Sequence, residues 1–172
     1  RTELIRSRHL LRQLLSSQFK KPLKHWQIEE VENGPPDITN LPVGWHVSGS
    51  HSRGLCGYAL SSHPVGIDLE YRLQPRDFLA IGREFFSAAE QIALNSSDPH
   101  QRSTLFYRFW CTKEAIFKAA YSGTPLSLTS IDYFNPGAWN LTETQLRQYS
   151  LCIASAQPLD LITCAYSPKY DH

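Results

Sequence analysis

Two short segments of this chain carry acids and lysines at spacings that suit phosphate chemistry. The first follows Pro64 and reads Gly66-Ile67-Asp68-Leu69-Glu70. Its apolar and β-branched residues predict a short strand. Because side chains two apart on a strand share a face, Asp68 and Glu70 should point the same way. Two adjacent carboxylates favour a bound cation.

The second segment lies about forty residues later, in a long helical pattern. That pattern begins near Asp98-Pro99, a capping residue followed by proline, and ends where the chain reads Ser122-Gly123-Thr124-Pro125. Glu114 and Lys118 are four residues apart and therefore lie on one face of the helix. An ordinary solvated ion pair is the simplest explanation for such a spacing.

The neighbours of Glu114 indicate a buried helix instead. Apolar side chains occur nearly all round it, namely Leu105, Phe106, Phe109, Trp110, Ile116, Phe117 and Tyr121. A buried carboxylate is costly unless a cation pairs with it, so we expect a metal ion shared with Asp68 and Glu70. Three hard oxygen ligands suit Mg²⁺, which is usually held by one or two carboxylates and substrate phosphates. Lys118 would face an anion nearby.

These segments resemble the signature of the 4′-phosphopantetheinyl transferases, a Gly-(Ile/Val)-Asp strand followed by a Trp-x-x-Lys-Glu-Ala-x-x-Lys helix. The Asp68-Leu69-Glu70 form is similar to the monomeric surfactin-synthetase-activator type rather than to the short trimeric holo-acyl-carrier-protein synthases. The resemblance runs from about residue 6 to 166, and it includes two more segments, Ser50-His51-Ser52 and Phe85-Phe86-Ser87-Ala88-Ala89-Glu90.

The resemblance implies that the phosphopantetheine arm of coenzyme A is transferred to a serine of an apo acyl, peptidyl or polyketide carrier protein, with release of adenosine 3′,5′-bisphosphate. It also implies roles for single residues. Asp68, Glu70 and Glu114 fall on the magnesium ligands, and Glu114 is the candidate that deprotonates the incoming serine, directly or through a water. Carriers of fatty-acid, polyketide and nonribosomal-peptide synthesis all present such a serine.

The same resemblance assigns the contacts with coenzyme A. Lys118 falls on the lysine that contacts the pyrophosphate, and is therefore counted with Asp68 and Glu114 among the catalytic candidates. Ser50 and His51 fall on the pair that contacts the nucleotide phosphates. Lys113 also matches the motif and is counted with these coenzyme A-binding candidates; it either orients Glu114 or adds positive potential.

The reaction suits these residue types without reference to any family. Displacement at a diphosphate phosphorus needs its charge neutralised and its nucleophile aligned, which carboxylates, Mg²⁺ and lysine provide. Two rivals are a non-catalytic relative that binds coenzyme A or a metal, and a metal-dependent phosphohydrolase. The intact acids and lysines count against the first, and the absence of a separate water-activating dyad counts against the second.

One departure from the family pattern concerns the nucleotide. Gly34-Pro35-Pro36 stands where the family usually has a Gly-(Lys/Arg)-Pro turn, and Pro35 cannot supply the expected cation. A basic N-terminal stretch could contact phosphates instead, although a solvated helix face explains it equally well. Its members are Arg6, Arg8, Arg12, Lys20, Lys21 and Lys24.

Other motif residues have structural explanations. Glu90 follows Ser87 by three residues, which predicts a capping box, so Glu90 is left out of the site. Phe85, Phe86, Phe109 and Trp110 have helical spacing and are expected in the core.

Composition favours a compact enzyme. A chain of 172 residues with 41% hydrophobic content can bury one core or two small halves, and a net charge of +1 argues against nonspecific nucleic-acid binding. The four cysteines have no close-pair spacing, so we expect no zinc site, no disulfide framework and a reducing cytoplasm. No stretch approaches the roughly 20 apolar residues of a membrane span. Because no methionine occurs, we expect native residues before Arg1.

The periodicities predict an α+β protein. We expect a first helix around Leu11, strands at 45–48, 55–61 and 65–70, helices at 76–83, 88–95 and 99–121, and strands at 128–134, 149–155 and 159–166. Segments 16–40 and 136–148 are predicted loops. Helix followed by strands, twice over, is similar to the pseudo-twofold transferase fold. Its two similar α+β halves would be 1–64 and 65–172, with the active site between them in a monomer.

Overall fold

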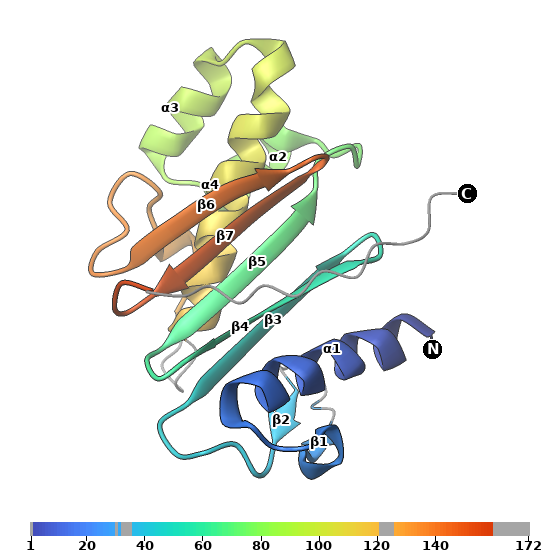
Figure 1. The fold of residues 1–172 in the computed structure, drawn as a ribbon. Coiled ribbons are helices and arrows are strands. Elements are labelled where there is room, and N and C mark those ends of the chain that lie inside the picture. The colour runs from blue at the N-terminus through green and yellow to red at the C-terminus, as the bar shows by residue number, and fades with distance from the viewer. Residues whose placement is uncertain (1, 30, 32–35, 121–125, 160–172) are drawn as a thin grey trace.

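The computed structural model describes residues 2–29, 31, 36–120 and 126–159 (Figure 1). Four α-helices form in these ranges: α1 Thr2–Phe19, α2 Phe78–Phe85, α3 Ala88–Ser96 and α4 Pro99–Ala119. The strands are β1 Ile28–Glu29, β2 Asp37–Ile38, β3 His46–Ser52, β4 Leu55–Ser61, β5 Val65–Tyr71, β6 Asn140–Leu146 and β7 Tyr149–Ser155. Two 3₁₀ helices are η1 Leu23–His25 and η2 Leu128–Ser130.

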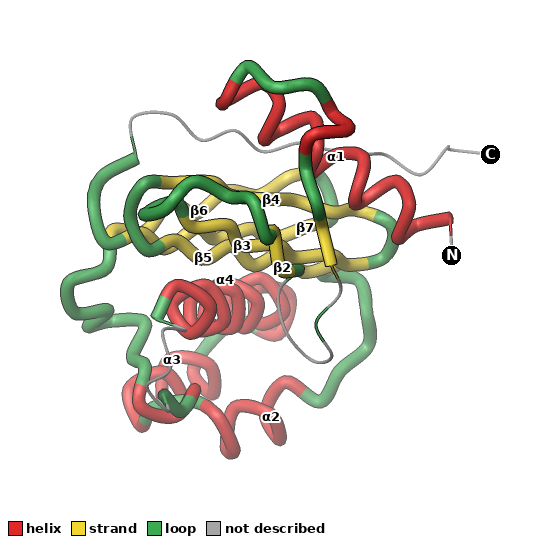
Figure 2. The backbone as a smooth tube through the Cα atoms, turned by 90° about the horizontal axis from the view of Figure 1, so that it is seen from below, coloured by secondary structure: helices red, strands yellow, loops and turns green. Residues whose placement is uncertain are grey.

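The strands form a middle layer between helices. Figure 2 shows α1 on one side of the strands and α4 on the other, with α2 and α3 beyond α4. Antiparallel pairing gives a three-stranded sheet in the order β5-β7-β6, a β3-β4 hairpin and a short β1-β2 pair. The predicted α+β class is confirmed, and the described part of the chain contains no helix long and apolar enough to cross a bilayer.

Helix α4 approaches β5 unusually closely because the strand has glycine at the contact. A Cβ atom at Gly66 would lie 2.0 Å from the carbonyl oxygen of Ala115 and 2.5 Å from the amide nitrogen of Ala119. No side chain fits between backbones at that separation. The glycine therefore lets α4 lie directly over the strand that carries Asp68 and Glu70.

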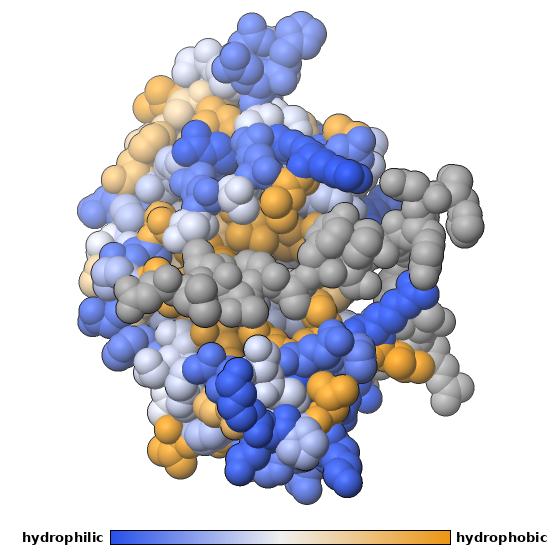
Figure 3. All heavy atoms as spheres, viewed as in Figure 1, coloured by the Kyte–Doolittle hydropathy of each residue, from blue (hydrophilic) through white to orange (hydrophobic). Residues whose placement is uncertain are grey.

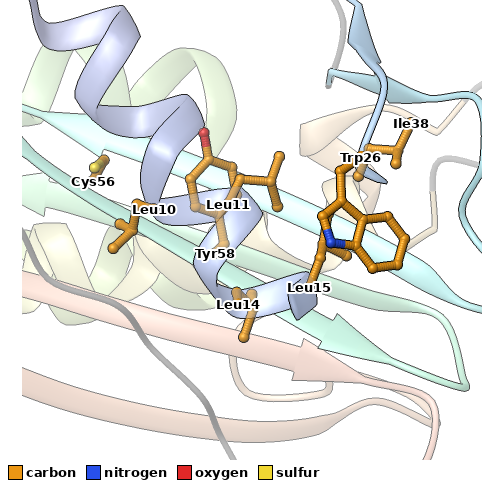
Figure 4. Close-up of a cluster of buried hydrophobic side chains, with 8 residues drawn as sticks. All are labelled: Leu10, Leu11, Leu14, Leu15, Trp26, Ile38, Cys56 and Tyr58. Atoms are coloured by element: carbon orange, nitrogen blue, oxygen red, sulfur yellow. The ribbon is translucent and has the colours of Figure 1, made fainter. Parts of the chain in front are cut away.

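Helix α1 packs its leucines on the β3-β4 hairpin. Figure 4 shows Leu10, Leu11, Leu14 and Leu15 of the helix gathered with Cys56 and Tyr58 of β4, and with Trp26 and Ile38 from the following segment. The 3.6-residue repeat of the helix explains this stripe. On the face of the molecule drawn in Figure 3, hydrophobic side chains also gather over the strands. A second buried cluster joins Leu55 of β4 to Ile67 and Leu69 of β5.

Most of the predicted elements are confirmed, with ends that differ by up to two residues. The first helix, strands 55–61, 65–70 and 149–155, and the three helices of the middle segment all form as expected. Helix α4 is buried along much of its length, as its aromatic content predicts. The capping box of α3 is present, with Ser87 and Glu90 in both of its hydrogen bonds.

Three predictions about segments are wrong. Strand 128–134 does not form: Ser127 caps η2 through the Thr129 amide, and only an isolated bridge between Asp132 and Asn135 follows. The predicted loop 136–148 contains β6, whose side chains are mostly exposed and polar, so it lacks a hydrophobic signal. The predicted loop 16–40 contains the end of α1 together with η1, β1 and β2.

A further difference concerns the strand expected at 45–48. It continues to Ser52, which places Ser50, His51 and Ser52 within β3 rather than after it. Leu159 begins the last predicted strand, and residues 160–166 lie outside the described residues, as do Gly34, Pro35, Tyr121 and Cys164. The division at residues 64 and 65 stays a prediction, and β5 begins at Val65.

Candidate active site

Strand β5 and helix α4 bring four of the predicted residues together. Asp68 and Glu70 share the side of β5 on which Gly66 meets α4, because all three positions are two apart. Glu114 and Lys118 come from the last turns of α4, above this side. The residues on the other side of the strand, Ile67 and Leu69, pack into the hydrophobic cluster with β4.

Asp68 is the most buried acid of the group, with 5% of its surface exposed. Its Oδ1 accepts hydrogen bonds from Lys118 Nζ at 2.7 Å and from Ser50 Oγ at 3.1 Å. The same Lys118 ammonium donates to the carbonyl of Ile67 at 3.3 Å, which holds it at the edge of β5. Oδ2 of Asp68 is buried and accepts no hydrogen bond from any described residue. One oxygen is thus fully engaged while the other lacks a donor.

Glu70 is half-buried and has a cation beside it. Its Oε2 accepts from Arg76 at 3.3 Å and from Ser52 Oγ at 3.5 Å. Burial raises the pKa of Glu70, and the charge of Asp68 adds to the rise. Arg76 and a hydrogen bond from Trp110 oppose that rise in pKa. The two neighbouring acids therefore repel one another, and each needs positive charge nearby.

Glu114 completes the acidic group from the helix. Burial is the main cause that raises its pKa, the charge of Asp68 adds to the effect, Lys118 opposes it, and Glu70 makes a smaller contribution in the raising direction. Because the charge of Asp68 raises the pKa of both Glu70 and Glu114, the three carboxylates lie in one electrostatic environment. Lys118 is the cation common to all three.

The arrangement fits a hard divalent cation, although it is not a ready-made coordination sphere. No group of three or more His, Cys, Asp or Glu side chains in the described ranges is spaced to hold an ion as it stands. Yet Asp68 Oδ2 is a buried acceptor without a hydrogen bond from any described residue. Beside it lie Glu70 and Glu114, and both have pKa values raised by burial and by the charge of Asp68. Oxygen donors with uncompensated negative charge are the donor set that Mg²⁺ prefers.

A polar hollow lies between α4 and strands β6 and β7. Its volume is about 380 Å³, and its lining includes Cys111 of α4 and Ser150 and Cys152 of β7. Cys152 lies directly opposite Asp68 in the sheet, and Ser150 lies opposite Glu70. Ser150 Oγ is buried without a partner among the described residues. The hollow is roomy and polar enough to hold water.

The structure places Lys113 apart from this group. Its ammonium is 1% exposed and pairs with Glu90 at 2.9 Å, and it also donates to the carbonyl of Ile131. Glu90 in turn accepts from the Tyr133 amide at 2.6 Å and from the Ser87 amide at 2.7 Å. Lys113 therefore ties α4 to the start of α3 and to the segment after η2, on the side of the helix away from Glu114.

Ser50 and His51 are separated by the alternation of the strand. Ser50 faces β5 and reaches Asp68, whereas His51 shares its side of β3 with Val47, which packs with the leucines of α1. His51 is exposed and lies on the α1 side of the hairpin. The side chains of Ser50 and His51 thus face different sides of the β3-β4 hairpin.

Three residues near the acids are absent from the sequence-based site, namely Ser52, Arg76 and Trp110. Ser52 belongs to the Ser-His-Ser motif, and its position two after Ser50 on a strand would have placed both on one side. Trp110 lies one turn before Glu114 on the helix, and that spacing was a usable signal. Arg76 reaches Glu70 from the segment before α2, for which the sequence offers no signal.

With this geometry in place, the class of protein is clear. The chain belongs to the 4′-phosphopantetheinyl transferase superfamily, whose family model matches residues 64–166. Among its relatives, 4′-phosphopantetheinyl transferase psf-1 of Bacillus pumilus is 33% identical over 121 residues, which cover 70% of this chain and 51% of the relative. The transferase Sfp of Bacillus subtilis is 33% identical over 70% of this chain and 53% of its own length.

A shorter relative is covered more fully. The 4′-phosphopantetheinyl transferase AcpT of Salmonella typhimurium is 30% identical over 133 residues, which are 76% of this chain and 67% of that protein. The chain spans about half the length of the two Bacillus relatives. The type predicted from Asp68-Leu69-Glu70, that of the surfactin-synthetase activator, is confirmed by these matches.

Proposed function

We propose that this protein transfers the 4′-phosphopantetheine arm of coenzyme A to a serine of an apo carrier protein and releases adenosine 3′,5′-bisphosphate. The observation that carries the proposal is the contact between Lys118 of α4 and Asp68 of β5, beside a carboxylate oxygen that no described residue hydrogen-bonds. In a member of this superfamily, such a pair suits the binding of a diphosphate together with a metal ion. The ammonium would face the diphosphate, and the carboxylate oxygen would face the metal ion.

The residues take the following roles in this proposal. Lys118 binds the pyrophosphate of coenzyme A and offsets charge on the leaving phosphate. Glu114, half-buried with a raised pKa, accepts the proton of the carrier serine directly or through a water, and a carboxylate with raised pKa is a better base. The new bond joins the serine oxygen to the phosphorus next to the pantetheine, and the bond from that phosphorus to the bridging oxygen breaks.

Asp68, Glu70 and Glu114 would hold Mg²⁺. When bound, that ion supplies Lewis-acid stabilisation of the phosphate oxygens. Ser50, His51 and Lys113 were predicted to bind coenzyme A. His51 faces the α1 side and stays in the proposed coenzyme A-binding set. Ser50 donates its hydroxyl proton to Asp68 and Lys113 is engaged with Glu90, so we assign both side chains to the support of the site rather than to coenzyme A.

The proposed partners are coenzyme A and a carrier domain of fatty-acid, polyketide or nonribosomal-peptide synthesis, acted on by a monomer in the cytoplasm. Two buried cysteines without disulfide partners, Cys111 and Cys152, support a reducing compartment. A non-catalytic relative that binds coenzyme A or a metal is the second candidate. It is favoured by one observation, namely that Asp68 and Glu70 already pair with Lys118 and Arg76.

The test is direct modification of carriers. The protein is incubated with coenzyme A, Mg²⁺ and a panel of apo carrier proteins, and each carrier is weighed by mass spectrometry. A mass gain equal to the phosphopantetheine arm, abolished by a chelator, supports the transferase. Measurable coenzyme A binding without a gain on any carrier supports the non-catalytic candidate.

A matched variant distinguishes a loss of activity at the site from a loss of the folded structure. Asp68→Asn keeps the shape of the side chain but removes the charge that faces Lys118, so transfer should fall by at least roughly a hundredfold while the circular dichroism spectrum is unchanged. Ser17→Ala, an exposed change on α1, should leave the rate unaltered. Near-normal turnover of Asp68→Asn would remove this acid from the site.

A further inference from the structure

Three alternate serines of β3 face the edge of β5. Ser48 Oγ accepts from the Ile67 amide at 3.1 Å, Ser50 Oγ from the Leu69 amide at 3.1 Å, and Ser52 Oγ from the Tyr71 amide at 3.0 Å. We call these residues the serine stripe. Strands β3 and β5 share no backbone pairing, because β3 pairs with β4 and β5 with β7. Side-chain oxygens therefore take the place of a strand along this edge.

The register of these bonds shows how the strands run. Each step of two residues along β3 matches a step of two along β5, so the two strands are parallel and the spacing between partners is constant. At the far end, the Tyr149 hydroxyl donates to the carbonyl of Arg53, the first residue of the β3-β4 turn. The hairpin is thus fixed against β5 and β7 over its whole length.

Two of the three hydroxyls also donate to the predicted metal ligands. Ser50 Oγ donates to Asp68 Oδ1 at 3.1 Å, and Ser52 Oγ lies 3.5 Å from Glu70 Oε2. A serine hydroxyl has one proton and two acceptor sites. Each of these two hydroxyls therefore accepts from the backbone of β5 and directs its only proton to the carboxylate of the residue just before that amide.

This arrangement leaves Ser50 without a donor for another group. To donate to a phosphate, its hydroxyl would have to release Asp68, which is buried and already has one oxygen without a partner in the described ranges. Ser48 is the comparison for Ser50. It makes the same bond to β5 and is buried, and its hydroxyl makes no hydrogen bond to a carboxylate in the described residues.

We propose that Ser50 and Ser52 are positioning residues, which orient Asp68 and Glu70 toward a divalent cation through the hydrogen bonds they donate. The inference deepens the proposed function and rests on it for the identity of the site. Partners that orient a ligand in this way commonly change metal affinity ten- to a hundredfold when they are removed. Contact of Ser50 with the nucleotide is the competing role, and the two roles differ in which ligand they affect.

The experiment measures Mn²⁺ and coenzyme A binding separately, each in the absence of the other. Free Mn²⁺ is followed by electron paramagnetic resonance. Coenzyme A binding is followed by calorimetry in the presence of a chelator that removes divalent metal ions. We expect Ser50→Ala to weaken Mn²⁺ binding about tenfold, with less effect on coenzyme A, and Ser52→Ala to act in the same direction. Ser48→Ala, which breaks the same kind of link to β5, should change Mn²⁺ affinity less than twofold.

The opposite pattern would overturn the proposal. If Ser50→Ala weakens coenzyme A binding and leaves Mn²⁺ affinity intact, Ser50 is a nucleotide contact. Equal losses of Mn²⁺ affinity in Ser48→Ala and Ser50→Ala would mean that the stripe acts only on the fold, and a wild-type protein that binds no Mn²⁺ also refutes the inference. Ser50→Thr retains the hydroxyl, so recovery of affinity there supports orientation even if the alanine variant is unstable.

Failure of the proposed function would look different. Mn²⁺ binding that depends on Ser50, in a protein that modifies no carrier, would leave the positioning role intact and remove the transferase. If the protein modifies carriers but Ser50→Ala binds Mn²⁺ normally, the transferase assignment stands and the positioning role is refuted.

Discussion

At the scale of single residues, Lys118 is bound to β5 and its charge acts on all three acids of the site. Its ammonium joins the carbonyl of Ile67 to the carboxylate of Asp68, and its charge lowers the pKa of Glu114 against the effect of burial. A lysine held this way has no freedom to form a surface ion pair with its helix neighbour, the arrangement that spacing alone suggests. Its position at the edge of β5 instead places positive charge where a phosphate can meet the acids.

Replacement of Lys118 by alanine should therefore affect coenzyme A more than chemistry. Loss of a charged hydrogen bond costs about 1.5–3 kcal/mol, so we expect KM for coenzyme A to rise roughly ten- to a hundredfold, with a smaller fall in kcat. Steady-state kinetics with a saturating carrier protein measures both. Lys118→Arg, which retains the charge, should recover part of the affinity, and an unchanged KM in the alanine variant would exclude the contact.

The sequence predicted the residue types of the site better than their partners. Asp68, Glu114 and Lys118 follow from strand and helix periodicity, because those periods fix which side chains share a face. Lys113 and Lys118 both belong to the motif, but their spacing does not indicate that the Lys113 side chain is buried beside Glu90. Arg76 comes from a connection between elements, and such a contact depends on tertiary packing rather than on any local pattern.

At the scale of elements, the contact between α4 and β5 determines the geometry of the site. The strand supplies Asp68, the helix supplies Glu114 and Lys118, and Gly66 sets how close they come. Periodicity gave both elements correctly, since each has a strong hydrophobic pattern. Periodicity did not predict β6, because an edge strand with exposed polar residues has no hydrophobic pattern. The pairing of β6 with β7 depends instead on the turn at Arg147.

Gly66→Ala should destabilise the protein strongly. The added Cβ would overlap the backbone of Ala115 and Ala119, and backbone cannot move aside as a flexible side chain can. We expect a loss of about 3 kcal/mol in the free energy of unfolding, measured by urea titration. Gly57→Ala on β4 is the matched control, because its Cβ would meet only Ile67 Cδ1 at 3.2 Å. Similar losses in the two variants would refute the argument.

The buried pair of Lys113 and Glu90 is a second feature at this scale. Lys113→Met should cost roughly 3–5 kcal/mol, because it leaves the Glu90 carboxylate buried without its cation. The double variant Glu90→Gln with Lys113→Met should recover much of this stability, since no charge is then left uncompensated. Urea unfolding of the three proteins measures the effect. A double variant no more stable than Lys113→Met would contradict this account.

At the scale of the whole molecule, raised pKa values limit stability at alkaline pH. Burial, the charge of Glu143 and a hydrogen bond to Glu143 raise the pKa of Tyr133 from 10.0 to about 12, against the opposing charge of Arg108. The folded protein thus holds this phenolic proton more tightly than the unfolded chain does. The stabilisation is complete below about pH 10 and is lost as pH rises toward about 12.

Tyr133→Phe tests the contribution of this group. Wild-type protein should lose unfolding free energy between about pH 9 and pH 11, and the variant should lose less over the same interval, because it has no phenol to ionise. Urea midpoints at both pH values give the comparison. Equal losses in the two proteins would show that other groups, such as Tyr58 and Cys152, account for the alkaline limit.

The hydroxyls along β3 have a consequence for association between molecules. An edge strand with unpaired amides can recruit a strand from a second chain and so begin aggregation. On β5 the outward amides of Ile67, Leu69 and Tyr71 are already bonded to serine oxygens, so this border of the sheet offers no template. Replacing the three serines together would expose that template at the margin of the candidate site, and self-association would compete there with the proposed binding of a carrier.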